Sequence, residues 1–211
     1  MTNEDNTFGE DLRQAVEVLR HGGLILYPTD TVWGIGCDAT NEDAVHRVYS
    51  VKGRRDNKAL ITLVGDLGAL ERTVDAVPDI AYDLIECSDR PLTIVYDRGR
   101  GVAPALMGED GTLGIRLTRE RFSAALCRAL GRPLVSTSAN FSGALTPRTF
   151  DQIDPQLAAQ MDYVCLTGRD RKPGRPSIVM RLEQGGVFKI LQLTTADNTK
   201  AQRPQYQTHH R

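Results

Sequence analysis

The sequence predicts an α/β fold in which the sheet is mixed. Buried-strand patterns and amphipathic helix patterns alternate along the first half of the chain, as they do in α/β proteins. In the second half the strand patterns follow one another with fewer helices between them, which favours a mixed sheet. The length of 211 residues suits a single domain. We expect this domain to span 8–193, followed by a polar, aperiodic tail over 194–211.

Four segments have the helix pattern, in which apolar residues recur three or four positions apart: 12–19, 40–52, 80–85 and 122–129. Thr40 or Asn41 can cap the second helix, and Gly53 and Gly131 can end the second and the fourth. Pro78 is placed to open the third. Eight short apolar runs are predicted as strands: 24–27, 59–64, 92–96, 113–117, 133–136, 163–166, 177–180 and 187–191.

The composition excludes several classes of protein. With 26 basic and 27 acidic residues the net charge is −1, which argues against a dedicated nucleic-acid coat or membrane-surface binder. The acidic N-terminus is not a signal peptide, and no apolar run approaches the ~20 residues of a membrane helix. The four cysteines form no C-x-x-C pair, so we expect neither a zinc framework nor a redox motif, and a cytoplasmic location.

The first informative run is YPTDTVWGIGCDA (27–39), which follows a predicted buried strand. Thr29 and Thr31 can bind a small polar substrate there, because loops at strand ends carry the sites of α/β folds. Alternatively, the hydroxyls and the carboxylate only stabilise a strand-to-loop turn. The P-loop, the G-x-G-x-x-G fingerprint and the G-x-S-x-G elbow are all absent from the sequence.

Four cations, Lys52, Arg54, Arg55 and Lys58, lie between a predicted helix and a predicted strand in VKGRRDNKAL (51–60). Cations in this position can neutralise a triphosphate, with arginine forming bidentate contacts. The alternative is that Lys52 favours its helix C-terminus while the others belong to a solvated surface.

The run PLVSTSANFSG (133–143) leads from a buried strand directly into short polar side chains: Ser136, Thr137, Ser138, Asn140 and Ser142. These can donate to phosphate oxygens or help to hold Mg²⁺, or they can form a hydroxyl-rich turn or helix cap. Such a density of polar groups at the exit of an apolar strand favours a site. A basic loop, GRDRKPGRPS (168–177), is either a lid with glycine hinges or a solvated connection.

Together these runs resemble the YrdC-type threonylcarbamoyl-AMP synthase family. The family pattern combines a P-T-[DE]-T-x-[YW]-G-[LI]-G run, a K-x-R motif with a further Asn or Lys four residues on, a v-x-R-l segment and an S-x-N motif. Here they stand as PTDTVWGIG, Lys52-Gly53-Arg54 with Lys58, GIRL around Arg116, and Ser138-Ala139-Asn140. Their order and spacing agree with the family, and the resemblance covers roughly residues 12–191.

The resemblance implies a twisted open α/β sheet around a large basic cavity that binds ATP, L-threonine and bicarbonate with Mg²⁺. It also implies that the product, threonylcarbamoyl-AMP, passes to partner proteins that modify tRNA. The residues implied to bind threonine are Thr29, Thr31, Arg116 and Ser177. Those implied to bind ATP are Lys52, Arg54, Lys58, Thr112, Ser136, Ser138, Asn140 and Thr146. Among the latter, Lys52 and Arg54 would be catalytic by stabilising charge on the phosphate oxygens.

Two positions depart from the family pattern. Pro176-Ser177-Ile178 stands in place of an S-T-[IV] segment, and Gln192 in place of an arginine that would contact ATP. Mg²⁺ would be held mainly by phosphates and water, so no metal site of the protein itself is expected. Two other functions stay open: a non-catalytic module that binds RNA or nucleotides in tRNA or ribosome maturation, and a different ATP-dependent adenylate-forming enzyme.

Overall fold

The strands observed in the structure agree closely with the apolar runs of the sequence. The computed structural model describes residues 3–53, 60–182 and 188–193. Its strands are β1 (Ile25–Tyr27), β2 (Gly34–Gly36), β3 (Ile61–Val64), β4 (Leu92–Tyr96), β5 (Leu113–Leu117), β6 (Leu134–Ser138), β7 (Tyr163–Val164), β8 (Ile178–Leu182) and β9 (Phe188–Leu193). Strand β2 was not predicted, because glycines weaken the strand pattern and Gly-Ile-Gly is typical of a turn.

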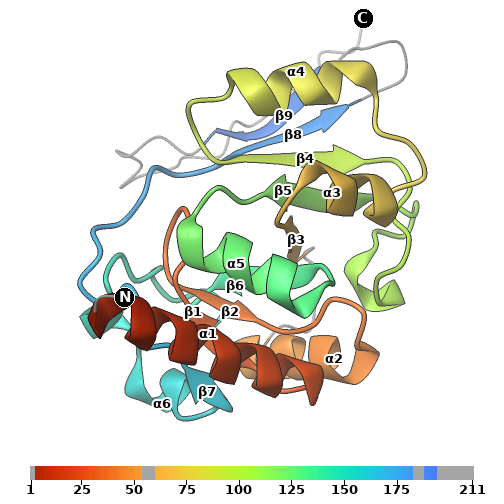
Figure 1. The fold of residues 1–211 in the computed structure, drawn as a ribbon. Coiled ribbons are helices and arrows are strands. Elements are labelled where there is room, and N and C mark those ends of the chain that lie inside the picture. Colours follow the sequence, from red (N-terminus) through yellow and green to blue (C-terminus); the bar gives the residue numbers. More distant parts are fainter. Residues whose placement is uncertain (1–2, 54–59, 183–187, 194–211) are drawn as a thin grey trace, which may run out of the picture.

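The strands of the described residues form one sheet in the order β7-β1-β2-β6-β3-β5-β4-β8-β9. Strand β3 is parallel to β5 and antiparallel to β6, and β4 is antiparallel to β5 but parallel to β8. The sheet is therefore mixed and open, as the sequence and the resemblance lead us to expect (Figure 1).

The helices are α1 (Asn3–Arg20), α2 (Glu42–Lys52), α3 (Leu67–Thr73), α4 (Asp79–Cys87), α5 (Arg121–Leu130) and α6 (Pro155–Ala158), with short 3₁₀ turns η1 (Pro104–Leu106) and η2 (Phe150–Gln152). Asn41 caps α2 through its side chain, and Gly53 and Gly131 end α2 and α5 with φ of 63° and 70°. Pro78 precedes α4 at the N-cap position rather than opening its first turn. Helices α3 and α6 were not predicted, because both are too short to establish a helical period.

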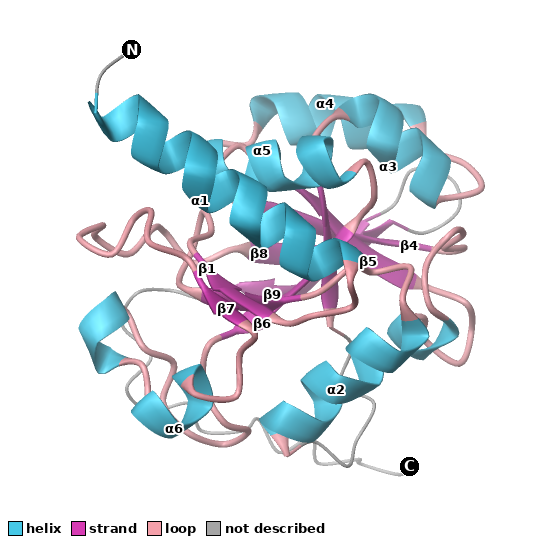
Figure 2. Ribbon diagram, turned by 60° about the horizontal axis from the view of Figure 1, so that its bottom comes forward, coloured by secondary structure: helices cyan, strands magenta, loops and turns pink. Residues whose placement is uncertain are grey.

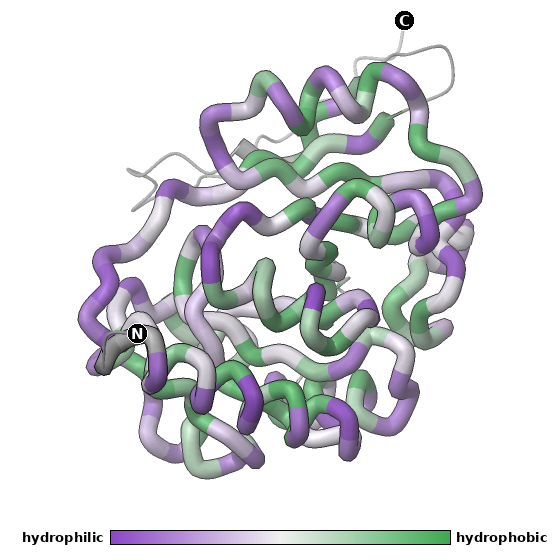
Figure 3. Tube along the Cα trace, in the orientation of Figure 1, coloured by the Kyte–Doolittle hydropathy of each residue, from purple (hydrophilic) through white to green (hydrophobic). Residues whose placement is uncertain are grey.

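The helices cover the two faces of the sheet unequally. In Figure 2, α1, α3, α4 and α5 lie on one side of the sheet, and α2 and α6 lie on the other. One face of the central strands is apolar and buried, with Ile94, Ile115 and Val135 each at most 2% exposed. Along α1, hydrophobic and hydrophilic residues alternate, as an amphipathic helix on such a face requires (Figure 3). Within the described residues, no helix has both the length and the apolar composition needed to cross a membrane.

The opposite face of the same strands carries polar side chains. Arg116 of β5 lies opposite Leu63 of β3 and Thr93 of β4. Strand β3 pairs with β6 in the register that sets Ile61 opposite Ser136. Residues paired across a ladder, and alternate residues of one strand, point to the same face. Arg116, Thr93, Ser136 and Ser138 therefore share one face, and this face holds the candidate site.

Candidate active site

Lys52 joins the end of α2 to the end of β6. Its side chain is the last of the helix, and the residue is only 1% exposed. The ammonium Nζ donates hydrogen bonds to the carbonyl oxygen of Ser138 at 2.6 Å and to Oδ1 of Asn140 at 3.1 Å. A buried ammonium needs such acceptors, so they fix its position. Lys52 does lie in the last turn of its helix, and it also joins this helix to Ser138 and Asn140, as a single site built from both motifs requires.

Asn140 organises the loop that follows β6. Its Oδ1 also accepts a hydrogen bond from the hydroxyl of Ser138 at 2.5 Å. Its Nδ2 donates to the carbonyl oxygens of Phe141 at 3.0 Å and Ala144 at 2.7 Å. The amide therefore uses both of its ends at once, and the loop after β6 is folded back around it. Both the binding interpretation and the turn interpretation of this run fit these contacts, because one side chain both shapes the loop and lines the site.

Gly34 lies where the run 27–39 packs against the run 133–143. In the β2–β6 ladder it lies opposite Ser138. A Cβ at this position would lie 3.0 Å from Cγ2 of Thr29 and 3.4 Å from Oγ of Ser136. Thr29 and Ser136 are both buried, with 7% and 5% exposure, so the room that glycine leaves there is small. Strand β2, which the sequence pattern missed, is thus what brings Thr29 beside the serines of β6.

The hydroxyl of Thr29 stabilises its own turn. It donates to the carbonyl oxygen of Val32 at 2.6 Å and accepts from the backbone N–H of Thr31 at 3.1 Å. The hydroxyls of Thr29 and Thr31 are 3.0 Å apart and share a further hydrogen bond. These are the contacts of the turn interpretation. A direct contact of Thr29 or Thr31 with the amino acid stays a prediction.

Arg116 forms a nearly buried ion pair with Asp30 from the same turn. Nη1 donates to Oδ1 of Asp30 at 2.6 Å, and the two side chains are 5% and 13% exposed. Nε donates to the hydroxyl of Thr93 at 3.1 Å. The turn 28–33 therefore reaches from β1 and β2 across to β5, and it connects the serines of β6 with Arg116. The sequence assigned Asp30 no role beyond its own turn, since only the tertiary structure brings it to Arg116.

The basic loop 168–177 crosses the same turn. The backbone N–H of Gly174 donates to the carbonyl oxygen of Thr31 at 2.7 Å. Arg171 pairs with Glu120 at 2.6 Å, and Arg175 pairs with Asp89 at 3.0 Å. These cations thus neutralise carboxylates of the protein in the conformation that the structure describes. Ser177, half-buried, immediately precedes β8 and by alternation points to the face of Arg116.

The remaining predicted ligands are not joined to this cluster. Thr112 precedes β5, and its hydroxyl donates to Oδ1 of Asp110 at 2.6 Å. It shares the face of Arg116 but lies four residues earlier, roughly 13 Å along the strand. Thr146 is exposed in the loop after Asn140. Arg54 and Lys58 lie outside the described residues, so their roles stay predictions.

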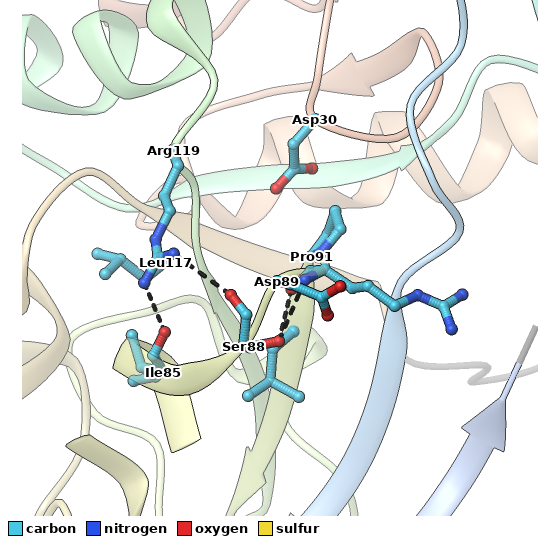
Figure 4. Close-up of a pocket in the computed structure, with 9 residues that line it drawn as sticks. Asp30, Ile85, Ser88, Asp89, Pro91, Leu117 and Arg119 are labelled. Carbon is cyan, nitrogen blue, oxygen red and sulfur yellow. Dashed lines mark hydrogen bonds between the residues drawn. The ribbon is translucent and has the colours of Figure 1, made fainter. Parts of the chain in front are cut away.

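A pocket of about 210 Å³ opens beside the Asp30–Arg116 pair. It is lined by Asp30, Ile85, Ser88, Asp89, Arg90, Pro91, Leu92, Leu117 and Arg119 (Figure 4). Asp30 points into it from the turn 28–33, opposite the segment that joins α4 to β4. Arg119 closes one side by donating to the carbonyl oxygens of Ile85 at 2.5 Å and Ser88 at 3.4 Å. The larger basic cavity that the resemblance implies stays a prediction.

The chain is similar to enzymes of known activity over most of its length. It is 36% identical over 181 residues to a threonylcarbamoyl-AMP synthase of Stenotrophomonas maltophilia, which covers 84% of this chain and 97% of that enzyme. It is 34% identical over 188 residues to the threonylcarbamoyl-AMP synthase of Shigella flexneri, covering 88% and 98%.

Solved structures show the same fold. The P. abyssi Sua5 structure complexed with L-threonine superposes with a TM-score of 0.75 at 26% identity, covering 85% of this chain and 53% of that one. The structure of E. coli YciO also superposes with a TM-score of 0.75 at 26% identity, and the match covers 89% of this chain and 91% of YciO. The Sua5_yciO_yrdC family model, described as telomere recombination, matches residues 17–193. The chain therefore belongs to the Sua5/YciO/YrdC family.

Proposed function

We propose that this chain is a threonylcarbamoyl-AMP synthase, which joins L-threonine, bicarbonate and ATP and releases pyrophosphate. The observation that carries this proposal is that Lys52 contacts Ser138 and Asn140 at the end of β6, while the turn 28–33 brings Asp30 to Arg116 and Thr29 close to Ser136. A fixed ammonium and hydroxyls suit phosphate oxygens, and a guanidinium suits the carboxylate of an amino acid. The two relatives from S. maltophilia and S. flexneri, whose alignments cover 84% and 88% of this chain, are named for the same activity.

The reaction needs no nucleophile from the protein. The amine nitrogen of threonine forms a bond to the carbon of CO₂ and loses a proton, which gives a carbamate. With bicarbonate as the donor, a carbon–oxygen bond also breaks and water leaves. A carbamate oxygen then attacks the α-phosphorus of ATP, the bond from that phosphorus to the bridging oxygen breaks, and pyrophosphate leaves. Negative charge accumulates on phosphate oxygens, so catalysis consists of positioning and electrostatic stabilisation. This step makes the chain a nucleotidyltransferase.

The residues divide this work between two ends of the site. Lys52, with Arg54 and Lys58, would stabilise the triphosphate, while the hydroxyl of Ser138 would turn from Oδ1 of Asn140 to donate to phosphate oxygens. Arg116 would bind the threonine carboxylate. Among the described residues, no three His, Cys, Asp or Glu side chains gather as metal ligands do. Oδ1 of Asn140 already accepts from Lys52 and Ser138, so Mg²⁺ would enter with ATP, held mainly by phosphate oxygens and water.

We infer that the adenylate passes to partner proteins that modify tRNA, and that the reaction takes place in the cytoplasm. A mixed anhydride of a carbamate and a phosphate reacts readily with water, so a short path to the next enzyme would preserve it. Direct contact with RNA is the less favoured part of the proposal, because the net charge is −1 and arginines of the loop 168–177 pair with carboxylates.

The decisive experiment measures pyrophosphate release from ATP with Mg²⁺, in the presence and absence of L-threonine and bicarbonate. Release that requires both, with threonylcarbamoyl-AMP identified by mass, supports the proposal. Release with threonine replaced by another amino acid would favour a different adenylate-forming enzyme. Salt-sensitive RNA binding with no turnover would favour a non-catalytic module.

A further inference from the structure

The guanidinium of Arg116 is held by two side chains on two different nitrogens. Thr93, which is fully buried, accepts from Nε at 3.1 Å, and Asp30 accepts from Nη1 at 2.6 Å. A guanidinium is a planar fork with five N–H donors, so two such contacts fix both its position and its plane. Among the residues that the structure describes, Nη2 has no hydrogen-bond acceptor. One nitrogen of the fork thus remains for a ligand.

Asp30 is itself held in place from both sides of the turn. The hydroxyls of its neighbours Thr29 and Thr31 share a hydrogen bond of 3.0 Å. Gly174 donates to the carbonyl oxygen of Thr31, and it lies so close that an added Cβ would be 2.0 Å from the carbonyl oxygen of Asp30. The turn therefore has little freedom, and its carboxylate reaches Arg116 from one direction.

We propose that Asp30 is a positioning residue, which fixes Arg116 so that Nη2 faces the carboxylate of the amino-acid substrate. This inference rests on the proposed function, because it takes threonine as the ligand of Arg116. Preorganisation is the physical reason: a side chain ordered before binding does not have to be ordered by the substrate. A buried guanidinium that lost its carboxylate would also turn toward other acceptors. Asp30 therefore determines threonine affinity without contacting the phosphates.

Two substitutions at Asp30 separate geometry from charge. Asp30→Ala removes the acceptor, so the KM for threonine is expected to rise about 10–100-fold, as expected for losing a hydrogen bond to a charged group. Asp30→Asn keeps an oxygen acceptor and should restore most of this affinity. The KM for ATP and kcat should stay within about threefold in both variants, because the proposal assigns the pair to the threonine carboxylate and not to the phosphates. Glu10→Ala, which removes an exposed carboxylate paired with Arg13 on α1, is the control and should leave both KM values unchanged.

A substrate analogue tests whether the effect passes through the carboxylate. L-Threoninamide keeps the amine and the hydroxyl but has no carboxylate, so its inhibition constant should be the same in the wild-type chain and in Asp30→Ala. If Asp30→Ala does not fold, Thr93→Val, which removes the acceptor of Nε, should raise the threonine KM about 5–30-fold.

Measuring threonine binding by calorimetry distinguishes a failure of the proposed function from a failure of the positioning role of Asp30. Threonine binding without pyrophosphate release in the wild-type chain would count against the proposed function alone. Wild-type turnover with an unchanged threonine KM in Asp30→Ala would overturn the positioning role alone. An equal loss of threonine and threoninamide affinity would also overturn it, since the effect would then not pass through Arg116 and the carboxylate.

Discussion

The ammonium of Lys52 donates a hydrogen bond of 3.1 Å to the amide oxygen of Asn140, although 88 residues separate the two in the chain. This contact connects the K-x-R motif to the S-x-N motif across the end of β6. It makes the two motifs one site, in which a buried positive charge and a loop of fixed shape depend on each other.

Replacing Lys52 with methionine should abolish most of the turnover while the fold is kept. Methionine fills the buried space of the lysine stem. Alanine would leave a cavity there, because position 52 is only 1% exposed. Loss of one charge-stabilising donor should lower kcat about 10²–10³-fold. Steady-state pyrophosphate release measures this, with Arg13→Met, an exposed arginine on α1, as the control. Near-normal kcat in a folded Lys52→Met protein would remove Lys52 from the catalytic group.

Asn140→Asp should weaken ATP binding and loosen the loop after β6. The side chain of aspartate has no N–H group, so the hydrogen bonds to the carbonyl oxygens of Phe141 and Ala144 are lost. A carboxylate then faces these two oxygens. We expect the KM for ATP to rise about 5–30-fold. Asn41→Asp is the matched control, because aspartate caps a helix N-terminus as well as asparagine does. An unchanged KM in Asn140→Asp would mean that the loop does not shape the nucleotide site.

Gly174→Ala should disturb the crossing between the basic loop and the turn 28–33. The new Cβ would lie 2.0 Å from the carbonyl oxygen of Asp30, so the two segments must separate, lowering the free energy of unfolding by about 1–3 kcal/mol. Gly9→Ala on α1, where a Cβ meets nothing within 4 Å, should instead stabilise the protein by up to about 1 kcal/mol.

Thermal melting compares these two glycine variants. Limited proteolysis within 168–177, with and without MgATP and threonine, then tests whether the loop also acts as a lid. Equal cleavage with and without ligand in the wild-type chain would leave it a plain connection.

Only one of the four thiols should react in the native protein at pH 8. Cys87 is exposed, whereas Cys37, Cys127 and Cys165 are buried. Burial raises the pKa of Cys127 from 9.0 to about 12, and raises the pKa values of Cys37 and Cys165 as well. A chromogenic disulfide reagent should therefore release one equivalent of thiolate from the native chain and four after unfolding.

The same shifts predict how stability depends on pH. A thiol whose pKa is raised in the folded state contributes stability that is complete below the unfolded pKa near 9 and declines as the pH rises toward 12. The melting temperature should thus fall from about pH 9 upward. If the melting temperature of a Cys127→Ala variant falls with pH as steeply as that of the wild-type chain, this thiol does not contribute to the pH dependence.

Most of the secondary structure could be predicted, because it depends on patterns within a few residues. Strands β4 and β5 coincide with the predicted runs 92–96 and 113–117, and the caps Asn41 and Gly131 lie where the sequence places them. Strand β2 was missed because two of its three residues are glycines, and its pairing with β6 is a long-range property. Helix α3 was missed because its seven residues barely establish a period.

The sequence by itself determined the fold class, the strands of the central sheet and an ordered set of polar motifs that resembles one enzyme family. The tertiary structure alone decided which polar groups meet. Arg116 reaches Asp30 across 86 residues, and Lys52 reaches Ser138 across 86. The physical reason is that periodicity and capping are set by near neighbours, whereas these pairs are set by the order of the strands, by the register of their ladders and by the way the turn 28–33 lies across β5.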